Sequence, residues 1–251
     1  MTEGRFSDHF SNDSAEYRRA RPRYPMALFE HIVSLAPGRS LAWDCATGNG
    51  QAALSVAEHF DHVVATDASQ EQLSHAAPHP KVEYRNALAH ESGLESDSVD
   101  LLTIAAALHW FAKDDFFTEV RRVLKPGGVI AAWSYGARIE VDPKVDEAIL
   151  RFGAEVLGPY WPPEFQYNVS GYRDLPFPFE EIDPPTVDVA VDWTIEDLIS
   201  NVRTWSGYSG FTKQNGREPL EELESRLRPA WGEHTTRTVR WPLHFKIGRV
   251  T

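Results

Sequence analysis

The residues best suited to ligand chemistry lie in a glycine-containing turn at 44–53, which reads Asp-Cys-Ala-Thr-Gly-Asn-Gly-Gln-Ala-Ala. Glycine lets a backbone turn sharply and lets a ligand approach it closely. The spacing from Gly48 to Ala53 matches the pattern G-x-G-x-x-A, which in dinucleotide-binding proteins places a pyrophosphate at a helix N-terminus. The turn therefore indicates a site for a nucleotide-type cofactor.

Two carboxylates beside this turn separate one class of cofactor from another. Asp44 precedes the first glycine by four residues, where its charge would repel a pyrophosphate and attract a ligand that carries an ammonium group. S-adenosylmethionine has an ammonium group, a sulfonium group and no phosphate. Asp67 ends the next apolar segment, where an ionised carboxylate can accept hydrogen bonds from both hydroxyls of a ribose. Asp44 is thus the discriminating residue, unless it only caps the turn.

Further candidates follow a continuous apolar run at 99–107, at the point where ligand crevices of parallel α/β sheets open. We expect His109 to touch the cofactor or the acceptor, and it is the candidate catalytic residue if a general base is needed. We expect Trp110 to form a wall of the same pocket. The alternative is an ordinary loop that caps the sheet.

Four arginines lie within residues 18–23 of a chain whose net charge is −12. Arg21 is the candidate for a bidentate contact to a carboxylate of the cofactor or the acceptor. Tyr17 and Tyr24 are expected to close the same lid, and Trp205 is the candidate pocket residue among the later tryptophans. The alternative for the arginines is a solvated helix face.

The composition excludes several classes of protein. The 251 residues are 42% hydrophobic and 25% charged, which is typical of a globular protein and not of a disordered or fibrous one. The acidic balance disfavours nucleic acid and anionic membranes as partners. We expect a cytoplasmic protein, because the single cysteine fits a reducing compartment and the first residues lack the pattern of a signal peptide. Neither C-x-x-C nor H-E-x-x-H occurs, so we expect no metal site.

Apolar periodicity predicts strands that alternate with helices in the first half of the chain. The predicted helices are 24–36, 51–60, 69–77 and 114–124, and the predicted strands are 40–44, 62–66, 82–85, 99–107 and 129–135. Residues 125–128, Lys-Pro-Gly-Gly, predict a stop and a turn. This alternation is typical of a parallel α/β sheet with right-handed crossovers.

The second half has a different pattern. Seven of the 17 prolines lie between 159 and 185, which indicates an insertion or lid. Strands are predicted at 187–193 and 238–248, with Pro242 fitting an edge, and helices at 194–205 and 219–231. We interpret 1–251 as a single domain with four parts, which are an N-terminal lid and helix (1–36), a cofactor-binding half (37–135), an insertion or lid (136–186) and C-terminal strands and helices (187–251).

These motifs, in this order, resemble those of class I S-adenosylmethionine-dependent methyltransferases. The shared segments are DCATGNG at 44–50, VVATDAS at 63–69, YRNA at 84–87, AAALHWF at 105–111 and RRVLKPGG at 121–128. YRRARPRYP at 17–25, RTWSGYSGF at 203–211 and VRWPLHFKIGRV at 239–250 make the chain most similar to the type 11 group, which contains trans-aconitate methyltransferase-like proteins. The resemblance runs nearly end to end.

The resemblance implies a Rossmann-like fold with a seven-stranded, mostly parallel sheet, an antiparallel last strand and a cofactor across the carboxyl ends of the first four strands. It implies that the methionine part of the cofactor is contacted by Asp44, Ala46, Gly48, Gly50, Ala105 and His109. It implies that the adenosine is contacted by Asp67, Ala68 and Gln72, and the adenine edge by Asn86 and Ala87. Two lid residues, Tyr17 and Arg21, complete the predicted cofactor site. Tyr24, Trp110 and Trp205 are left for the acceptor. Related sequences often have Gln where Ala106 stands, which marks a different pocket.

We therefore predict methyl transfer from S-adenosylmethionine to a small molecule, most simply to an oxygen of a carboxylate-bearing acceptor. A carboxylate is already ionised at neutral pH, so no proton has to be removed. The alternatives are an NAD(P)-dependent oxidoreductase, which Asp44 opposes, and a non-catalytic cofactor-binding module. Methylation of nucleic acid is opposed by the net charge, and the oligomeric state is not predicted.

Overall fold

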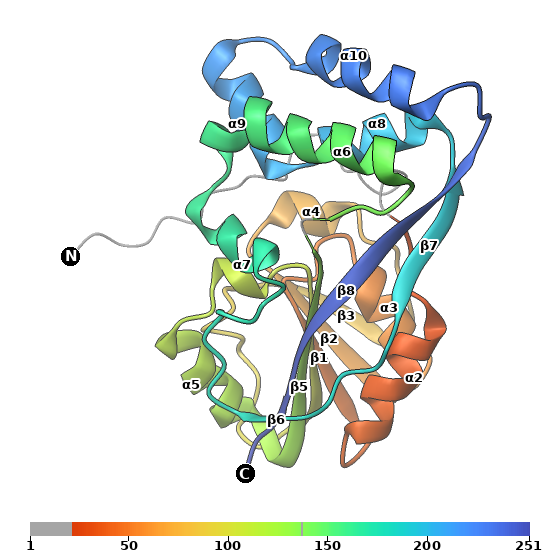
Figure 1. Cartoon of the computed structure of the whole chain (residues 1–251). Coiled ribbons are helices and arrows are strands. Elements are labelled where there is room, and N and C mark those ends of the chain that lie inside the picture. Colours follow the sequence, from red (N-terminus) through yellow and green to blue (C-terminus); the bar gives the residue numbers. More distant parts are fainter. Residues whose placement is uncertain (1–21, 137) are drawn as a thin grey trace.

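The computed structural model describes residues 22–136 and 138–251 of the chain (Figure 1). The predicted lid residues Tyr17 and Arg21 therefore lie outside the described residues. None of the helices described is long and apolar enough to cross a membrane.

A mostly parallel sheet forms the centre of the fold, in the order β3-β2-β1-β4-β5-β8-β6. Its strands are β1 (Leu41–Cys45), β2 (His62–Asp67), β3 (Val82–Asn86), β4 (Val99–Ala105), β5 (Leu124–Tyr135), β6 (Glu180–Glu181) and β8 (Arg237–Arg249). The first five strands pair in parallel, and β8 pairs antiparallel to β5. The predicted α/β class and the antiparallel last strand are confirmed. The strand order reverses between β1 and β4, which is where such sheets bind ligands.

Helices cover both faces of this sheet because successive strand residues point to opposite sides. On one face, α2 (Met26–Leu35) and α3 (Gln51–Ala57) bury their apolar sides against residues such as Ala42 and Val63. On the other face, α5 (Asp114–Val123) packs against Trp43 and Leu102. The short helix α4 (Gln70–Ser74) begins at Ser69, whose side chain accepts a hydrogen bond from the Gln72 backbone N–H. The predicted alternation of strands and helices is confirmed, with element ends shifted by a few residues.

The segment at 125–128 differs from its prediction. Helix α5 ends at Val123, one residue before its predicted end, and β5 starts at once at Leu124. The partner of Val99 is Leu124 and the partner of Leu101 is Val129, so the extra residues form a bulge inside the strand. Gly127 has a φ of 77°, which glycine adopts without strain. The predicted turn is therefore a bulge in one continuous strand.

A helical layer lies over the carboxyl ends of the parallel strands, at the top of Figure 1. It contains α6 (Pro143–Arg151), α8 (Ile195–Arg203), α9 (Ser206–Asn215) and α10 (Leu220–Trp231). The insertion continues from α6 through the short turns η2 (Phe152–Val156), η3 (Gly158–Tyr160) and η4 (Pro163–Phe165) into α7 (Gln166–Val169). Helix α8 opens with a capping box between Thr194 and Asp197, which confirms its predicted start. Helices α6 and α9 were not predicted.

Strand β8 joins the two parts of the molecule. Its first half pairs with β7 (Asp188–Trp193), and its second half pairs with β5. Pro242, which the sequence places at an edge, lies where the pairing passes from β7 to β5, and its carbonyl accepts a hydrogen bond from the Gly136 backbone N–H at 3.3 Å. β8 therefore pairs both with the central sheet and with β7, the strand that leads into α8 of the helical layer.

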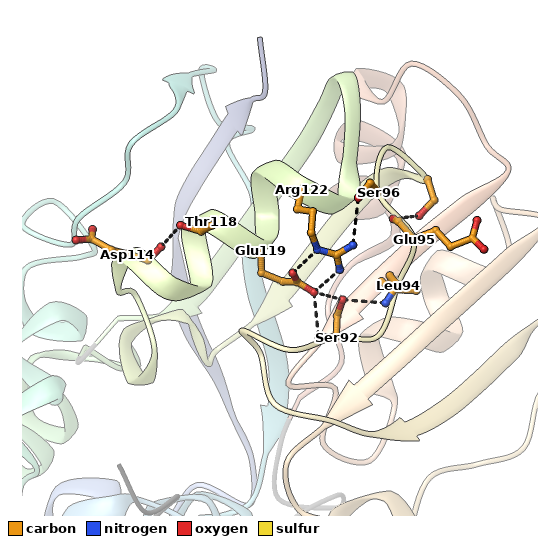
Figure 2. Close-up of polar contacts among 9 residues, drawn as sticks. Ser92, Leu94, Glu95, Ser96, Asp114, Thr118, Glu119 and Arg122 are labelled. Carbon is orange, nitrogen blue, oxygen red and sulfur yellow. Dashed lines mark hydrogen bonds and ion pairs between the residues drawn. The ribbon is translucent and has the colours of Figure 1, made fainter. Parts of the chain in front are cut away.

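An ion pair between the buried Glu119 and the exposed Arg122 holds the loop between β3 and β4 against α5 (Figure 2). Glu119, which is 7% exposed, accepts hydrogen bonds from the Ser92 backbone N–H at 3.0 Å and from Arg122 Nε at 2.7 Å. The Arg122 guanidinium lowers the pKa of Glu119 to about 2. Because residues 87–90 of this loop line a large cavity at the carboxyl edge of the sheet, the network fixes one wall of that cavity.

Candidate active site

A cavity of about 1560 Å³ is lined by residues at the carboxyl ends of the parallel strands, such as Ala105, and by residues of the helical layer, such as Ile149 and Asn201. Its lining includes eleven residues that the sequence singles out, namely Tyr24, Ala46, Gly48, Asp67, Ala68, Gln72, Ala87, Ala105, His109, Trp110 and Trp205. Cavities for one drug-sized ligand measure about 300–1,000 Å³. This cavity is therefore large enough for a cofactor and a second molecule together.

Asp67 shapes the glycine turn from the end of β2. One oxygen of its carboxylate accepts a hydrogen bond from the Gly48 backbone N–H at 2.8 Å, and the other accepts one from the Ser69 N–H at 2.8 Å. A carboxylate offers about four acceptor positions. Asp67 can therefore hold the turn and also face a vicinal diol in the cavity, which agrees with the predicted ribose contact.

Asp44 lies beneath the turn and does not line the cavity. It is 1% exposed, and its two oxygens accept hydrogen bonds from the hydroxyls of Thr47 at 2.5 Å and Thr103 at 2.6 Å. Burial raises the pKa of Asp44 to about 6, against its ordinary value of 3.8. The Asp44 carboxylate thus ties the glycine turn to β4. This is the capping role that the sequence left open as an alternative. Asp44 is not part of the cavity wall, where its predicted contact with the methionine would lie.

Gly50 and Asn86 also lie behind the cavity wall. Gly50 has a φ of 85°, and a Cβ at this position would collide with the hydroxyl of Tyr84. The Asn86 side chain donates a hydrogen bond to the backbone oxygen of Asp67 at 2.9 Å, and it lines a shallow neighbouring pocket together with Ala87. Both residues shape the turn and the strand ends, and neither lines the main cavity.

Two alanines at the cavity edge have left-handed backbone conformations. Ala46 follows β1 with a φ of 54°, and Ala106 follows β4 with a φ of 55°. A side chain makes this conformation unfavourable, so such residues concentrate where the surrounding structure requires them, often at functional sites. The backbone N–H of Ala106 is held by the Trp133 carbonyl at 2.7 Å. Ala46 and Ala106 therefore follow β1 and β4, the two adjacent strands between which the strand order of the sheet reverses.

His109 is 7% exposed, and both of its ring nitrogens contact protein groups. Nδ1 lies 3.0 Å from the hydroxyl of Tyr172, and Nε2 lies 3.3 Å from the side-chain nitrogen of Asn168. The Asn168 side-chain oxygen accepts a hydrogen bond from the Ser134 hydroxyl at 2.7 Å. Tyr172, His109, Asn168 and Ser134 are all buried and linked in this order, and we call the four residues the His109 ring.

The His109 ring joins three segments around the cavity. If the Asn168 amide donates to Nε2, the neutral imidazole carries its proton on Nδ1 and donates it to Tyr172. Every group in the ring then has a partner, so the ring holds α7 against the ends of β4 and β5. This geometry favours a positioning role for His109 over the predicted role of general base.

Aromatic side chains enclose the rest of the cavity. Tyr24 stacks on Tyr135, with ring centroids 5.4 Å apart. Trp110 lies beside His109, at a centroid distance of 4.9 Å. Phe165, Asn168 and Tyr172 were not predicted as site residues, and Trp161 was not preferred among the later tryptophans, because the proline-rich segment that carries all four has no periodic pattern. Their only signal was the cluster of aromatic residues between the prolines.

Comparison with known proteins identifies the family. Residues 43–132 match a methyltransferase domain. A methyltransferase of Dictyostelium discoideum is 32% identical over 256 residues, an alignment that covers 99% of this chain and 97% of that protein. The chain belongs to the class I S-adenosylmethionine-dependent methyltransferases.

Other similarities agree with this family. A structure described as a type II methyltransferase from Anaeromyxobacter dehalogenans has 42% identity and a TM-score of 0.82, with 91% of this chain and 97% of that chain covered. A methyltransferase-like structure from Bacillus halodurans has 18% identity and a TM-score of 0.52, and shares the fold. The trans-aconitate-like subgroup stays a prediction, since these three relatives are described only as methyltransferases.

The cofactor of this methyltransferase is S-adenosylmethionine, and the described residues fit it. Asp67 lines the cavity beside the turn, and the segments 44–53 and 62–69 contain no Lys or Arg. This charge suits a cofactor with cationic groups and opposes the pyrophosphate of a dinucleotide. The alternative of an NAD(P)-dependent oxidoreductase is therefore not supported by the site or by the relatives.

Proposed function

We propose that this methyltransferase methylates an oxygen of a small, carboxylate-bearing acceptor. The observation that supports the proposal best is the lining of the cavity, which joins residues of the glycine turn such as Gly48 to aromatic residues of the insertion such as Trp161. A concave pocket with aromatic walls suits a small molecule rather than a macromolecule. Trp110 and Tyr24 also line this cavity.

The cofactor supplies a methyl group that is bonded to a sulfonium. When the methyl group is transferred to the acceptor oxygen, the sulfur leaves as a neutral thioether. The protein's own task is to align the acceptor oxygen with that methyl group and to exclude water, an effect worth about 7–11 kcal/mol in well-oriented reactions. A carboxylate acceptor requires no general base. The absence of a general base agrees with the contacts of His109, because protein groups hold both of its ring nitrogens.

Arg138 supports the choice of a carboxylate. Its side chain lines the cavity, is 68% exposed and pairs with Glu140 at 3.5 Å, so it can turn toward an anion at little cost. Arg23 and the arginines at 18–21 add positive charge to the segment that leads into Tyr24. Guanidinium groups match carboxylates in geometry as well as in charge.

The test is a screen with S-adenosylmethionine that carries a labelled methyl group, in which organic acids are compared with phenols and amines of similar size. We expect an acid to be preferred, with a turnover that is nearly flat from about pH 6.5 to 8.5, because a carboxyl group with a pKa of about 4 stays ionised there. A preferred phenol or amine, with a steep rise in rate near pH 7 that His109→Gln abolishes, would contradict the proposal. The cytoplasmic location stays a separate prediction, which imaging of the tagged chain in its cell would check.

A further inference from the structure

Three aromatic rings meet in the lining of the cavity, and we call them the aromatic clamp. Trp161 and Phe165 stack with their centroids 3.8 Å apart and their planes 9° from parallel. Trp205 approaches Trp161 at 5.7 Å. All three side chains line the cavity, although they come from the η3–η4 connection, from η4 and from the junction of α8 and α9.

The clamp is held in place from behind. The indole N–H of Trp161 donates a hydrogen bond to the Gly153 backbone oxygen at 2.9 Å. A Cβ on Gly207 would lie 2.7 Å from the Trp161 ring, so only glycine leaves room for the indole against α9. Rings that are fixed before a ligand arrives lose little conformational entropy on binding. The clamp is therefore a preformed surface.

The opposite side of this region is fixed as well. The turn η1 (Leu108–Trp110) contacts η4, which brings the segments of Trp110 and Phe165 together. Trp110 follows His109, whose ring of hydrogen bonds fixes that turn to α7. Flat aromatic faces on both segments favour a flat ligand, because stacked and edge-to-face ring pairs add to the energy of apolar burial.

The charged residues of the cavity lining favour one orientation of a ligand that has a single anionic end. Among the described residues, the acidic ones that line the cavity are Asp67, Asp115, Asp146, Glu147 and Glu164, and the basic ones are Lys113 and Arg138. Glu164 is next to Phe165, so an anionic group is disfavoured beside the clamp and is favoured near Lys113 or Arg138. A ligand with an aromatic body and an anionic end would therefore place its ring at the clamp and its carboxylate away from it.

We propose that the acceptor is an aromatic acid, with its ring packed against Phe165 and Trp205, which Trp161 supports from behind, and its carboxylate directed toward Arg138. The proposal rests on the proposed function and adds the chemical class of the acceptor's body. It identifies Phe165 and Trp205 as specificity-determining residues, because Trp161 is also needed to pack α9.

The test measures binding directly, by calorimetry with S-adenosylhomocysteine present. The probes are a ring acid, such as benzoate or phenylacetate, and a straight-chain aliphatic acid of similar size. The variants are Phe165→Leu and Trp205→Leu. The control is Phe179→Leu, since Phe179 is also partly buried but packs against Phe117 and Phe177 and does not line the cavity.

We expect each clamp variant to weaken binding of the ring acid about 2- to 12-fold, the range for the loss of one aromatic pair. The aliphatic acid should bind the clamp variants and the wild type alike, and Phe179→Leu should bind both acids as the wild type does. The methyl-transfer assay on the same variants should show KM rising for the ring acid alone.

Two outcomes separate this proposal from the proposed function. If aliphatic acids bind as well as ring acids and the clamp variants weaken both equally, the clamp is overturned while methylation of acids still holds. If ring phenols or ring amines are methylated in place of acids and the clamp variants weaken them selectively, the carboxylate assignment fails and the role of the clamp in binding rings is supported.

Discussion

Replacing Asp44 by Asn tests whether the glycine turn is built on a charge that destabilises the fold. Asp44 is 1% exposed, and burial raises its pKa to about 6 from an ordinary 3.8. One pKa unit corresponds to about 1.4 kcal/mol, so the ionised carboxylate costs the folded state about 3 kcal/mol once the pH exceeds its folded pKa.

The sign of the pH dependence follows from the raised pKa. Between about pH 4 and pH 6 the folded chain binds more protons at Asp44 than the unfolded chain does, so the free energy of unfolding falls as the pH rises. Asn keeps the shape and carries no charge, but its amide must rearrange the hydrogen bonds from Thr47 and Thr103. We expect Asp44→Asn to stabilise the protein by about 1–2 kcal/mol at neutral pH and to lose that advantage near pH 4.

The measurement is urea unfolding of both proteins at about pH 4.5 and pH 7.5, with the difference between them taken at each pH. Asp61→Asn is the control, because Asp61 is an exposed aspartate on the same half of the chain. We also expect Asp44→Asn to bind S-adenosylhomocysteine more weakly, since the turn loses an anchor. A variant that is less stable than the wild type at both pH values would refute the reasoning.

Four further predictions concern other parts of the site. Asp67→Ala should weaken S-adenosylmethionine binding by about 1.5–3 kcal/mol, the range for hydrogen bonds to a charged group, and unchanged affinity in calorimetry would remove Asp67 from the site. Tyr172→Phe should raise the acceptor KM and lower kcat while cofactor affinity is preserved, and equal losses in all three would indicate a general structural role. Glu119→Gln should cost about 2 kcal/mol of stability at neutral pH, because a pKa lowered to about 2 stabilises the fold above the ordinary pKa of 4.5, and the difference between variant and wild type should vanish as the pH falls toward 2. Hydrogen exchange across residues 5–24 should slow when the cofactor binds, and exchange that ignores the cofactor would count against an N-terminal lid.

The sequence predicted the elements whose signal is local. The apolar run at 99–107 and the capping residue Thr194 mark β4 and α8 correctly, since burial and capping depend on neighbouring residues. Helix α9 has two glycines and two serines among its ten residues, so its helix propensity is low, and packing of Tyr208 and Phe211 into the core stabilises it. Such a helix is determined by tertiary contacts and leaves little trace in the sequence.

The same distinction applies to the site. Asp67 could be placed at the cavity because it ends a strand. The burial of Asp44 could not be predicted, because one of the two hydroxyls that close over it comes from Thr103, 59 positions away. The partners of His109 are at least as distant in sequence, since Asn168 is 59 positions away and Tyr172 is 63, and both lie in a segment without periodicity. Residue types and spacing therefore identified the groups near the ligand, and distant contacts decided what each group does.

The shared strand β8 has a consequence for how this chain folds during synthesis. β8 follows every other described element in sequence, so it leaves the ribosome after β5 and β7 have already done so. Until then both strands expose backbone N–H and C=O groups along the edges that β8 later pairs, and unpaired edges invite association with other chains. The parallel sheet and the helical layer thus reach their final form in one late step, and a truncation before Arg237 would leave both incomplete.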